Sequence, residues 1–84
     1  MKAKEREERT ARQVGNALRR VRERRERKQY IVAEQAGITK GMLSAYEHGR
    51  RCPNVTTLVK VLTALDCTAE DFGRMVGPWG SLRC

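Results

Sequence analysis

The sequence predicts an all-α fold, a compact domain of five helices with a charged N-terminal arm. In several short stretches, apolar residues recur at the three- and four-residue spacing of a buried helical stripe. Residues suited to capping or ending a helix stand between these stretches. The chain has 84 residues, which allows one domain with a modest core and is too small to enclose a deep substrate cavity.

A charged segment opens the chain. Residues 1–13 are mostly Lys, Arg and Glu, and Glu5 and Arg9 have the i,i+4 spacing of a helical ion pair. We expect this segment to form an arm or an extension of the first helix. An amphipathic helix should follow and run to about Arg25. Its apolar stripe consists of Val14, Ala17, Leu18 and Val21.

Two further helical patterns meet across a turn of a few residues. The first begins near Gln29 and stops before Gly37, which can take the left-handed conformation that ends a helix. The second follows Thr39, whose side chain can cap it by accepting from a backbone N–H. The expected buried positions are Val32, Ala33, Ala36, Leu43 and Tyr46. This spacing describes a helix-turn-helix.

The exposed face predicted for the second helix of this pair is small and polar. It consists of Lys40, Gly41, Ser44, Ala45 and His48. Because this face carries no acidic side chain, a nucleic-acid duplex could approach it closely.

Two more helices complete the prediction. Pro53 suits a turn or a first helical position, and Asn54 can cap the helix that follows. The expected buried face of this helix consists of Val55, Leu58, Val59, Leu62 and Leu65. A last helix begins at Thr68, which forms a capping-box-like pair with Asp71. We place the domain at residues 14–76 and a C-terminal tail at residues 77–84.

Positive charge is concentrated in the first part of the chain. The net charge is +8, with fifteen Lys or Arg against seven Glu in residues 1–51 and three of each sign in residues 52–84. The excess therefore accompanies the helix-turn-helix. It raises the encounter rate with polyanions and gives a salt-sensitive affinity for phosphates. With no apolar run of membrane-spanning length and no signal peptide, we expect a cytoplasmic, nucleoid-associated protein without a membrane partner.

The sequence favours neither a metal site nor catalysis. Cys52, Cys67 and Cys84 are widely spaced and form no CxxC pair, so we expect no disulfide scaffold. His48 and Cys52 are close in sequence, but two further metal ligands at usable spacing are absent. There is no phosphate-binding glycine loop and no convincing acid/base pair. We therefore expect no catalytic residues, no metal and no cofactor.

The helices and their signatures resemble the phage repressor and Cro family, the XRE-type helix-turn-helix DNA-binding proteins. The resemblance covers about residues 14–72. Its most specific parts are the Q-x3-A-x3-G run from Gln29, the S-x-x-E-x-G run from Ser44, and Pro53 before an apolar helix that ends TALDCTAEDF. In order and at these separations, the three signatures together indicate a compact repressor-like helix-turn-helix domain.

The resemblance implies how such a domain would meet DNA. Gln29 matches a position that holds a backbone phosphate and so sets register. Lys40, Gly41, Ser44 and Ala45 match the positions that face base edges in the major groove. Lys40 can donate to guanine and Ser44 can bond several bases, whereas Ala45 offers only a methyl group and Gly41 offers nothing. Specificity is then expected from few direct contacts together with DNA shape.

The family also implies roles for neighbouring charges. His48, Arg50 and Arg51 follow the recognition helix and suit phosphate contacts, although Arg50 and Arg51 could instead be solvated loop charges. Arg22 and Glu47 match a family ion pair that links the first helix to the end of the third. The alternative is that Arg22 and Glu47 are unrelated surface charges.

Three features depart from the family pattern or extend it. Arg27 stands where the family usually has an apolar residue, and Tyr30 and Ile31 stand where it is commonly polar. The C-terminal apolar set is Phe72, Met75, Val76, Trp79 and Leu82. This set either forms a homodimer interface, which would place two recognition helices ~34 Å apart, or closes the core.

The sequence thus predicts a sequence-specific regulator that binds double-stranded DNA, a repressor or autoregulator that inserts its third helix in the major groove. The alternative is a helix-turn-helix module that binds protein, of antitoxin or coactivator type. RNA binding is less favoured because interleaved aromatic residues, which stack unpaired bases, are lacking.

Overall fold

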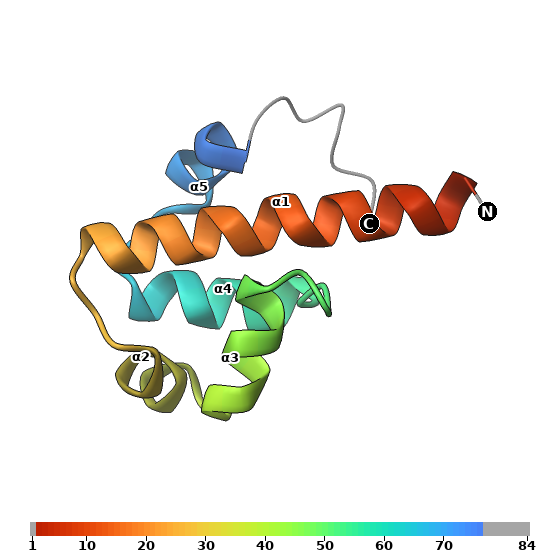
Figure 1. Ribbon diagram of the computed structural model, residues 1–84. Coiled ribbons are helices and arrows are strands. Elements are labelled where there is room, and N and C mark those ends of the chain that lie inside the picture. Colours follow the sequence, from red (N-terminus) through yellow and green to blue (C-terminus); the bar gives the residue numbers. More distant parts are fainter. Residues whose placement is uncertain (1, 77–84) are drawn as a thin grey trace.

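The computed structural model describes the backbone of residues 2–76 and the side chains of residues 8–76. This part of the chain is all-α and contains no strand (Figure 1). The helices are α1 (Lys2–Arg24), α2 (Gln29–Ala36), α3 (Lys40–Glu47), α4 (Val55–Ala64) and α5 (Ala69–Val76). The predicted fold class is confirmed.

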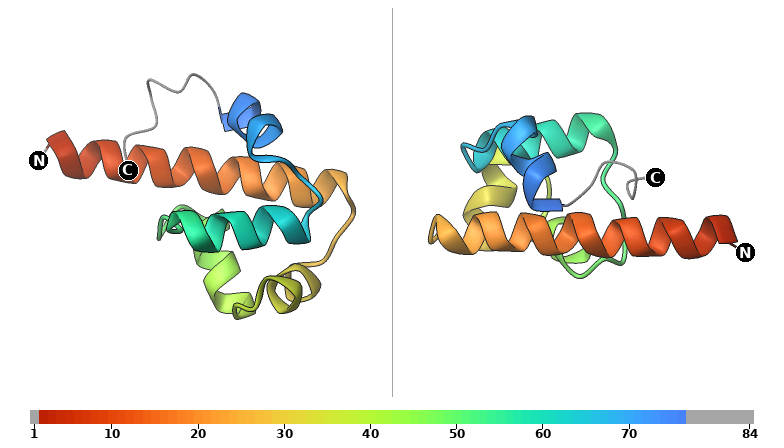
Figure 2. Two further views of the ribbon diagram at one scale, coloured as in Figure 1. Left: turned by 180° about the vertical axis from the view of Figure 1, so that it is seen from behind. Right: turned by 90° about the horizontal axis from the view of Figure 1, so that it is seen from above.

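The longest element is α1, which runs without a break from Lys2. The other four helices gather around its C-terminal part, and its first turns project beyond them (Figures 1 and 2). Among the described side chains of α1, Thr10 and Ala11 are already buried, before the expected start of the apolar stripe at Val14. The charged segment therefore continues the first helix, which is one of the two forms that we expected for this segment.

One core joins all five helices. It contains the α1 stripe, the expected buried residues of α2 and α3, and apolar side chains of α4 and α5. Leu18, Val32 and Val61 are completely buried at its centre. Helix α1 packs against α3, and α2 packs against both α3 and α4. The core therefore holds the two helices of the helix-turn-helix against α1 and α4.

Left-handed residues end four of the helices. At Gly37 (φ 73°) and Gly49 (φ 72°), the chain leaves α2 and α3. In each case the next residue donates back across the turn, as in the 2.9 Å bond from Ile38 N to Ala33 O, which is the Schellman arrangement. Glu26 (φ 52°) and Asp66 (φ 54°) end α1 and α4 in the same way without being glycine.

The buried face of α4 differs from the prediction. Val55 and Val59 are 77% and 52% exposed, whereas Val61 is buried with Leu62 and Leu65. Asn54 does cap the helix, since its Oδ1 accepts from Thr57 N at 2.8 Å. The packing partners of α4 bury Val61, Leu62 and Leu65, so Val55 and Val59 lie on the outer face, and the expected stripe was wrong at both positions.

The C-terminal apolar set is divided in the structure. Phe72 and Val76 are buried in the core of the single chain, and Met75 is partly buried against it. Trp79 and Leu82 lie outside the described residues. For Phe72 and Val76, the interpretation that these residues close the core is the one that the structure supports.

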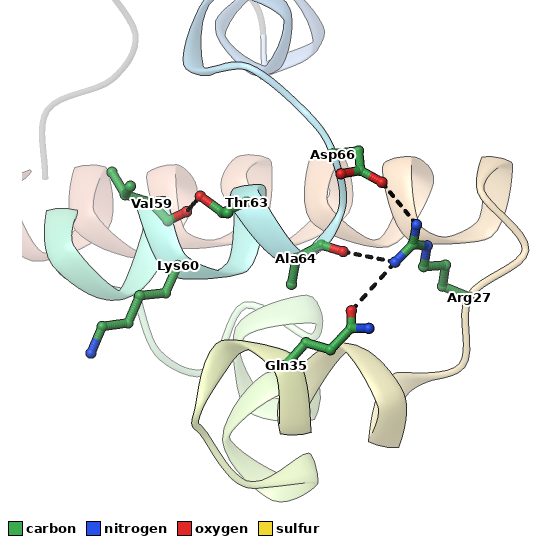
Figure 3. Close-up of a pocket in the computed structure, with 7 residues that line it drawn as sticks. All are labelled: Arg27, Gln35, Val59, Lys60, Thr63, Ala64 and Asp66. Atoms are coloured by element: carbon green, nitrogen blue, oxygen red, sulfur yellow. Dashed lines mark hydrogen bonds and ion pairs between the residues drawn. The ribbon is translucent and has the colours of Figure 1, made fainter.

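Arg27 replaces apolar packing with polar contacts at the corner before α2. Its guanidinium donates to the Ala64 carbonyl at 3.0 Å and to Gln35 at 3.3 Å, and it pairs with Asp66 at 2.9 Å (Figure 3). Ala64 is the last residue of α4, so Arg27 satisfies a carbonyl that has no partner within the helix. This corner borders a surface pocket of about 540 Å³ between α2 and α4. Arg27 therefore ties the helix-turn-helix to the end of α4.

Candidate nucleic-acid interface

The second helix of the helix-turn-helix, α3, has two chemically distinct faces. Leu43 and Tyr46 are buried, and Thr39 caps the helix by accepting from Met42 N at 3.0 Å. The outward face is made of the five predicted residues, of which Lys40, Gly41 and His48 are exposed and Ser44 and Ala45 are partly exposed. Glu47 is the only acidic residue of α3, and it is buried. The accessible side of α3 therefore carries no negative side chain.

The buried carboxylate of Glu47 joins three elements. Arg22 on α1 donates to it twice, from Nε at 2.7 Å and from Nη2 at 3.0 Å. Gln29, the first residue of α2, donates from Nε2 at 3.0 Å. The hydrogen bonds to Glu47 raise the pKa of Arg22, so its guanidinium stays charged. Arg22 and Glu47 are the ion pair that the family pattern implied, and Gln29 is a third member that sequence reasoning missed.

This network changes what Gln29 can do. A glutamine amide has two N–H groups, and one of them is committed to Glu47. Because Gln29 is partly exposed, its second N–H remains available to another acceptor. Gln29 is therefore held in a fixed orientation at the start of α2.

The imidazole of His48 folds back over the last turn of α3. Its Nδ1 lies 2.8 Å from the Ser44 carbonyl oxygen and 3.3 Å from Ser44 Oγ. Since a carbonyl can only accept, Nδ1 carries the hydrogen, and Nε2 of the neutral ring is an acceptor. Ser44 and His48 are four residues apart on the predicted exposed face, so this contact joins two neighbours on one helical surface.

Arg50 and Arg51 lie in the turn after α3, and both are exposed. Neither forms an ion pair with another residue of the described part, and Lys40 does not either. Their charges are therefore not neutralised by neighbours. The predicted set is thus placed along α3, at the start of α2 and in the turn that follows α3.

Gly41 is not required by the fold. A Cβ at this position would meet nothing closer than Thr39 Oγ1 at 3.8 Å. Nothing in the described part of the chain therefore requires the absence of a side chain at Gly41.

Neither a membrane span nor a metal cluster occurs among the described residues. Within residues 2–76, no helix combines the length and the apolar character that crossing a bilayer requires. No three His, Cys, Asp or Glu of the described part are grouped so that they could hold a metal ion. Burial raises the pKa of Cys67, which keeps its thiol protonated.

These features define a helix-turn-helix domain whose second helix is turned outward. A family model described as helix-turn-helix matches residues 18–72. The chain belongs to this family, the XRE-type, Cro/C1-like helix-turn-helix proteins, which are DNA-binding regulators and not typically enzymes. No curated protein matches the chain.

Proposed function

We propose that this protein is a sequence-specific regulator of transcription, a repressor or autoregulator, that inserts α3 into the major groove of double-stranded DNA. The observation that carries the proposal is the acid-free outward face of α3, together with the burial of Glu47 beneath it. A regulator that binds DNA in this way would act in the cytoplasm, at the nucleoid.

The outward face of α3 supplies few base-reading groups. Lys40 can donate to guanine O6 or N7, and the hydroxyl of Ser44 can bond several bases. Ala45 can contact a thymine methyl, and Gly41 lets the groove edge approach the helix backbone. The open space around Gly41 favours this role, since no described neighbour requires a glycine at this position.

Phosphate contacts would surround this face. Arg50 and Arg51 carry unneutralised charges, and Gln29 has one amide N–H left at the N-terminus of α2, where the helix dipole favours an anion. His48 is exposed at the end of α3, next to these arginines in the chain, and belongs to the same proposed phosphate-contacting set. Such contacts set register and affinity but carry no sequence information.

The small number of base contacts supports action as a homodimer. A good base contact discriminates by about 1–3 kcal/mol, so Lys40 and Ser44 give about 2–6 kcal/mol per subunit. Specific regulators need about 4–10 kcal/mol over random DNA. The lower end for one subunit falls below this range, whereas two subunits on a two-fold site, with recognition helices ~34 Å apart, would give about 4–12 kcal/mol and span it.

Selection from random duplexes tests the proposal. It should be done at two salt concentrations, followed by Kd measurements on selected and random DNA. We expect Lys40→Ala to lower the preference for the selected duplex by about fivefold or more. Lys60→Ala, which removes the same charge beside the α2–α4 pocket, is the matched control and should leave that preference unchanged. Recovery of no preferred sequence would refute the proposal.

A protein-binding module is the second candidate, favoured by one observation. The large apolar side chains that are exposed in the described part, Tyr30, Ile31, Val55 and Val59, all lie on α2 and α4. Where such residues form a contiguous patch, the patch is typical of a surface that meets another protein. An antitoxin or coactivator of this type would show little salt dependence in DNA binding and would associate tightly with a separate partner.

A further inference from the structure

A glycine lies where α1 passes the end of the recognition helix. A Cβ built on Gly15 would lie 3.0 Å from the carbonyl oxygen of Glu47 and closer still to that of Tyr46. Side-chain carbons in folded proteins do not approach a carbonyl oxygen that closely. Because both obstacles are backbone atoms, no change of rotamer could relieve the contact.

The turn after α3 meets α1 in the same way. Gly49 has a φ of 72°, and a Cβ there would lie 3.0 Å from the Cα of Arg12 and 2.7 Å from its Cγ. Arg12 and Gly15 are three residues apart, so they share one face of α1. Over this turn of α1, the two segments therefore meet backbone against backbone, a contact that we call the α1–α3 seam.

The local helix gives no reason for Gly15. It lies inside α1 and has no left-handed φ, and helix propensity favours alanine at such a position. Gly41, by comparison, has open space around it. The requirement at Gly15 therefore comes from α3, which is distant in sequence.

We infer that Gly15 is a positioning residue, whose missing side chain sets how α3 is presented to DNA. This inference rests on the proposed DNA-binding function. At the end of α3, Arg22 and Gln29 hold the side chain of Glu47 through hydrogen bonds. The α1–α3 seam holds the backbone of the same segment. A Cβ at Gly15 would move the end of α3 away from α1. Base contacts need close hydrogen-bond geometry, whereas long arginine side chains can adapt to a small shift.

Gly15→Ala tests this inference against Asn16→Ala, which changes the exposed neighbour on the same helix. Both are measured at a temperature where circular dichroism shows a fully folded chain. For Gly15→Ala we expect the ratio of Kd on random DNA to Kd on the selected duplex to fall about tenfold, as for one lost base contact. Its Kd on random DNA should change by less than about twofold, because phosphate contacts supply that term. Asn16→Ala should change neither value. Gly49→Ala should lower the ratio at least as much as Gly15→Ala, because alanine at a φ of 72° is strained in addition to the contact with α1.

Backbone amide shifts of the free protein give a readout that needs no DNA. Gly15→Ala should shift the amides of α3 and the following turn, whereas Asn16→Ala should shift only α1. An unchanged α3 spectrum or an unchanged Kd ratio would overturn the inference. So would loss of folding in both glycine variants, since the seam would then serve the fold and not the pose. If wild type prefers no duplex while the α3 amides shift, the proposed function fails and the control of α3 by Gly15 stands.

Discussion

The buried carboxylate at the end of α3 gives the sharpest prediction for stability. Glu47→Gln keeps the size and shape of the side chain but removes its charge. The new amide can accept from Arg22 through one atom only, and its NH2 group would face a donor of Arg22 or Gln29. The substitution therefore leaves a buried donor without an acceptor and a guanidinium without its counter-ion.

The structure sets the expected size of the effect. Removing one partner of a buried ion pair costs about 3–5 kcal/mol. The Glu47 side chain is 1% exposed, but that of Arg22 is 16% exposed and keeps a 2.9 Å bond to the Arg27 carbonyl. We therefore expect the lower end, about 3 kcal/mol. In a domain of this size, that corresponds to a fall in melting temperature of about 12–24 °C.

Thermal and urea unfolding followed by circular dichroism would measure this loss. Glu70→Gln is the matched control, because Glu70 pairs with Arg74 at 2.7 Å on the exposed surface of α5. Such pairs are worth about 0.5 kcal/mol or less. If Glu47→Gln destabilises the protein by no more than Glu70→Gln does, the carboxylate does not hold α3 against α1 and α2.

Five further substitutions test other parts of the fold by the same unfolding measurements. Val61→Ala should cost about 2 kcal/mol because it empties a buried site, whereas Val59→Ala on the exposed face of α4 should cost less than about 0.5 kcal/mol; equal losses would contradict the assigned α4 face. Glu26→Gly should stabilise the protein by up to about 1 kcal/mol by relieving a left-handed glutamate, and a loss of stability would show that this residue is not strained. Arg27→Leu should cost about 1 kcal/mol or less, since the contacts of this side chain are partly exposed. Thr39→Ala should cost about 1 kcal/mol through loss of the α3 cap, and an unchanged melting temperature would show that the cap does not contribute.

Local sequence signals predicted most of the fold. Gly37, Thr39 and Asn54 act on backbone groups within a few residues, so their roles as helix ends and caps could be read directly. Glu26 and Asp66 show the limit of this reasoning. Both end helices in the left-handed conformation without glycine, and a long-range contact such as that between Arg27 and Asp66 is absent from local patterns.

Ambiguous periodicity explains the error in α4. Apolar residues at Leu58, Val59, Val61 and Leu62 allow two overlapping stripes, and spacing alone did not choose between them. The i, i+3, i+4, i+7 run from Leu58 to Leu65 through Val61 was the correct one. The packing partners of α4 decide the matter, because only one of the two stripes can face the core.

At the interface, the sequence could place residues on faces but could not find contacts between distant elements. The family pattern supplied Arg22 and Glu47, yet the bond from Gln29 to the same carboxylate joins residues 18 positions apart. The need for Gly15 was equally hidden, since the obstacle to a side chain belongs to α3. Both features depend on how α1, α2 and α3 cross, and that geometry is set by the packed core.

The arrangement separates stability from recognition within one short helix. Leu43, Tyr46 and Glu47 hold α3 from beneath, while Lys40 and Ser44 face outward and make few contacts within the chain. Substitutions on the outward face should therefore alter DNA preference at little cost in stability, whereas substitutions beneath it should change both. Since the outward face offers so few base-reading groups, the discrimination of the proposed regulator would depend strongly on how accurately α3 is held. The buried carboxylate of Glu47 and the α1–α3 seam both hold α3 in position. Combining Glu47→Gln with Gly15→Ala should therefore lose more specificity than either change alone.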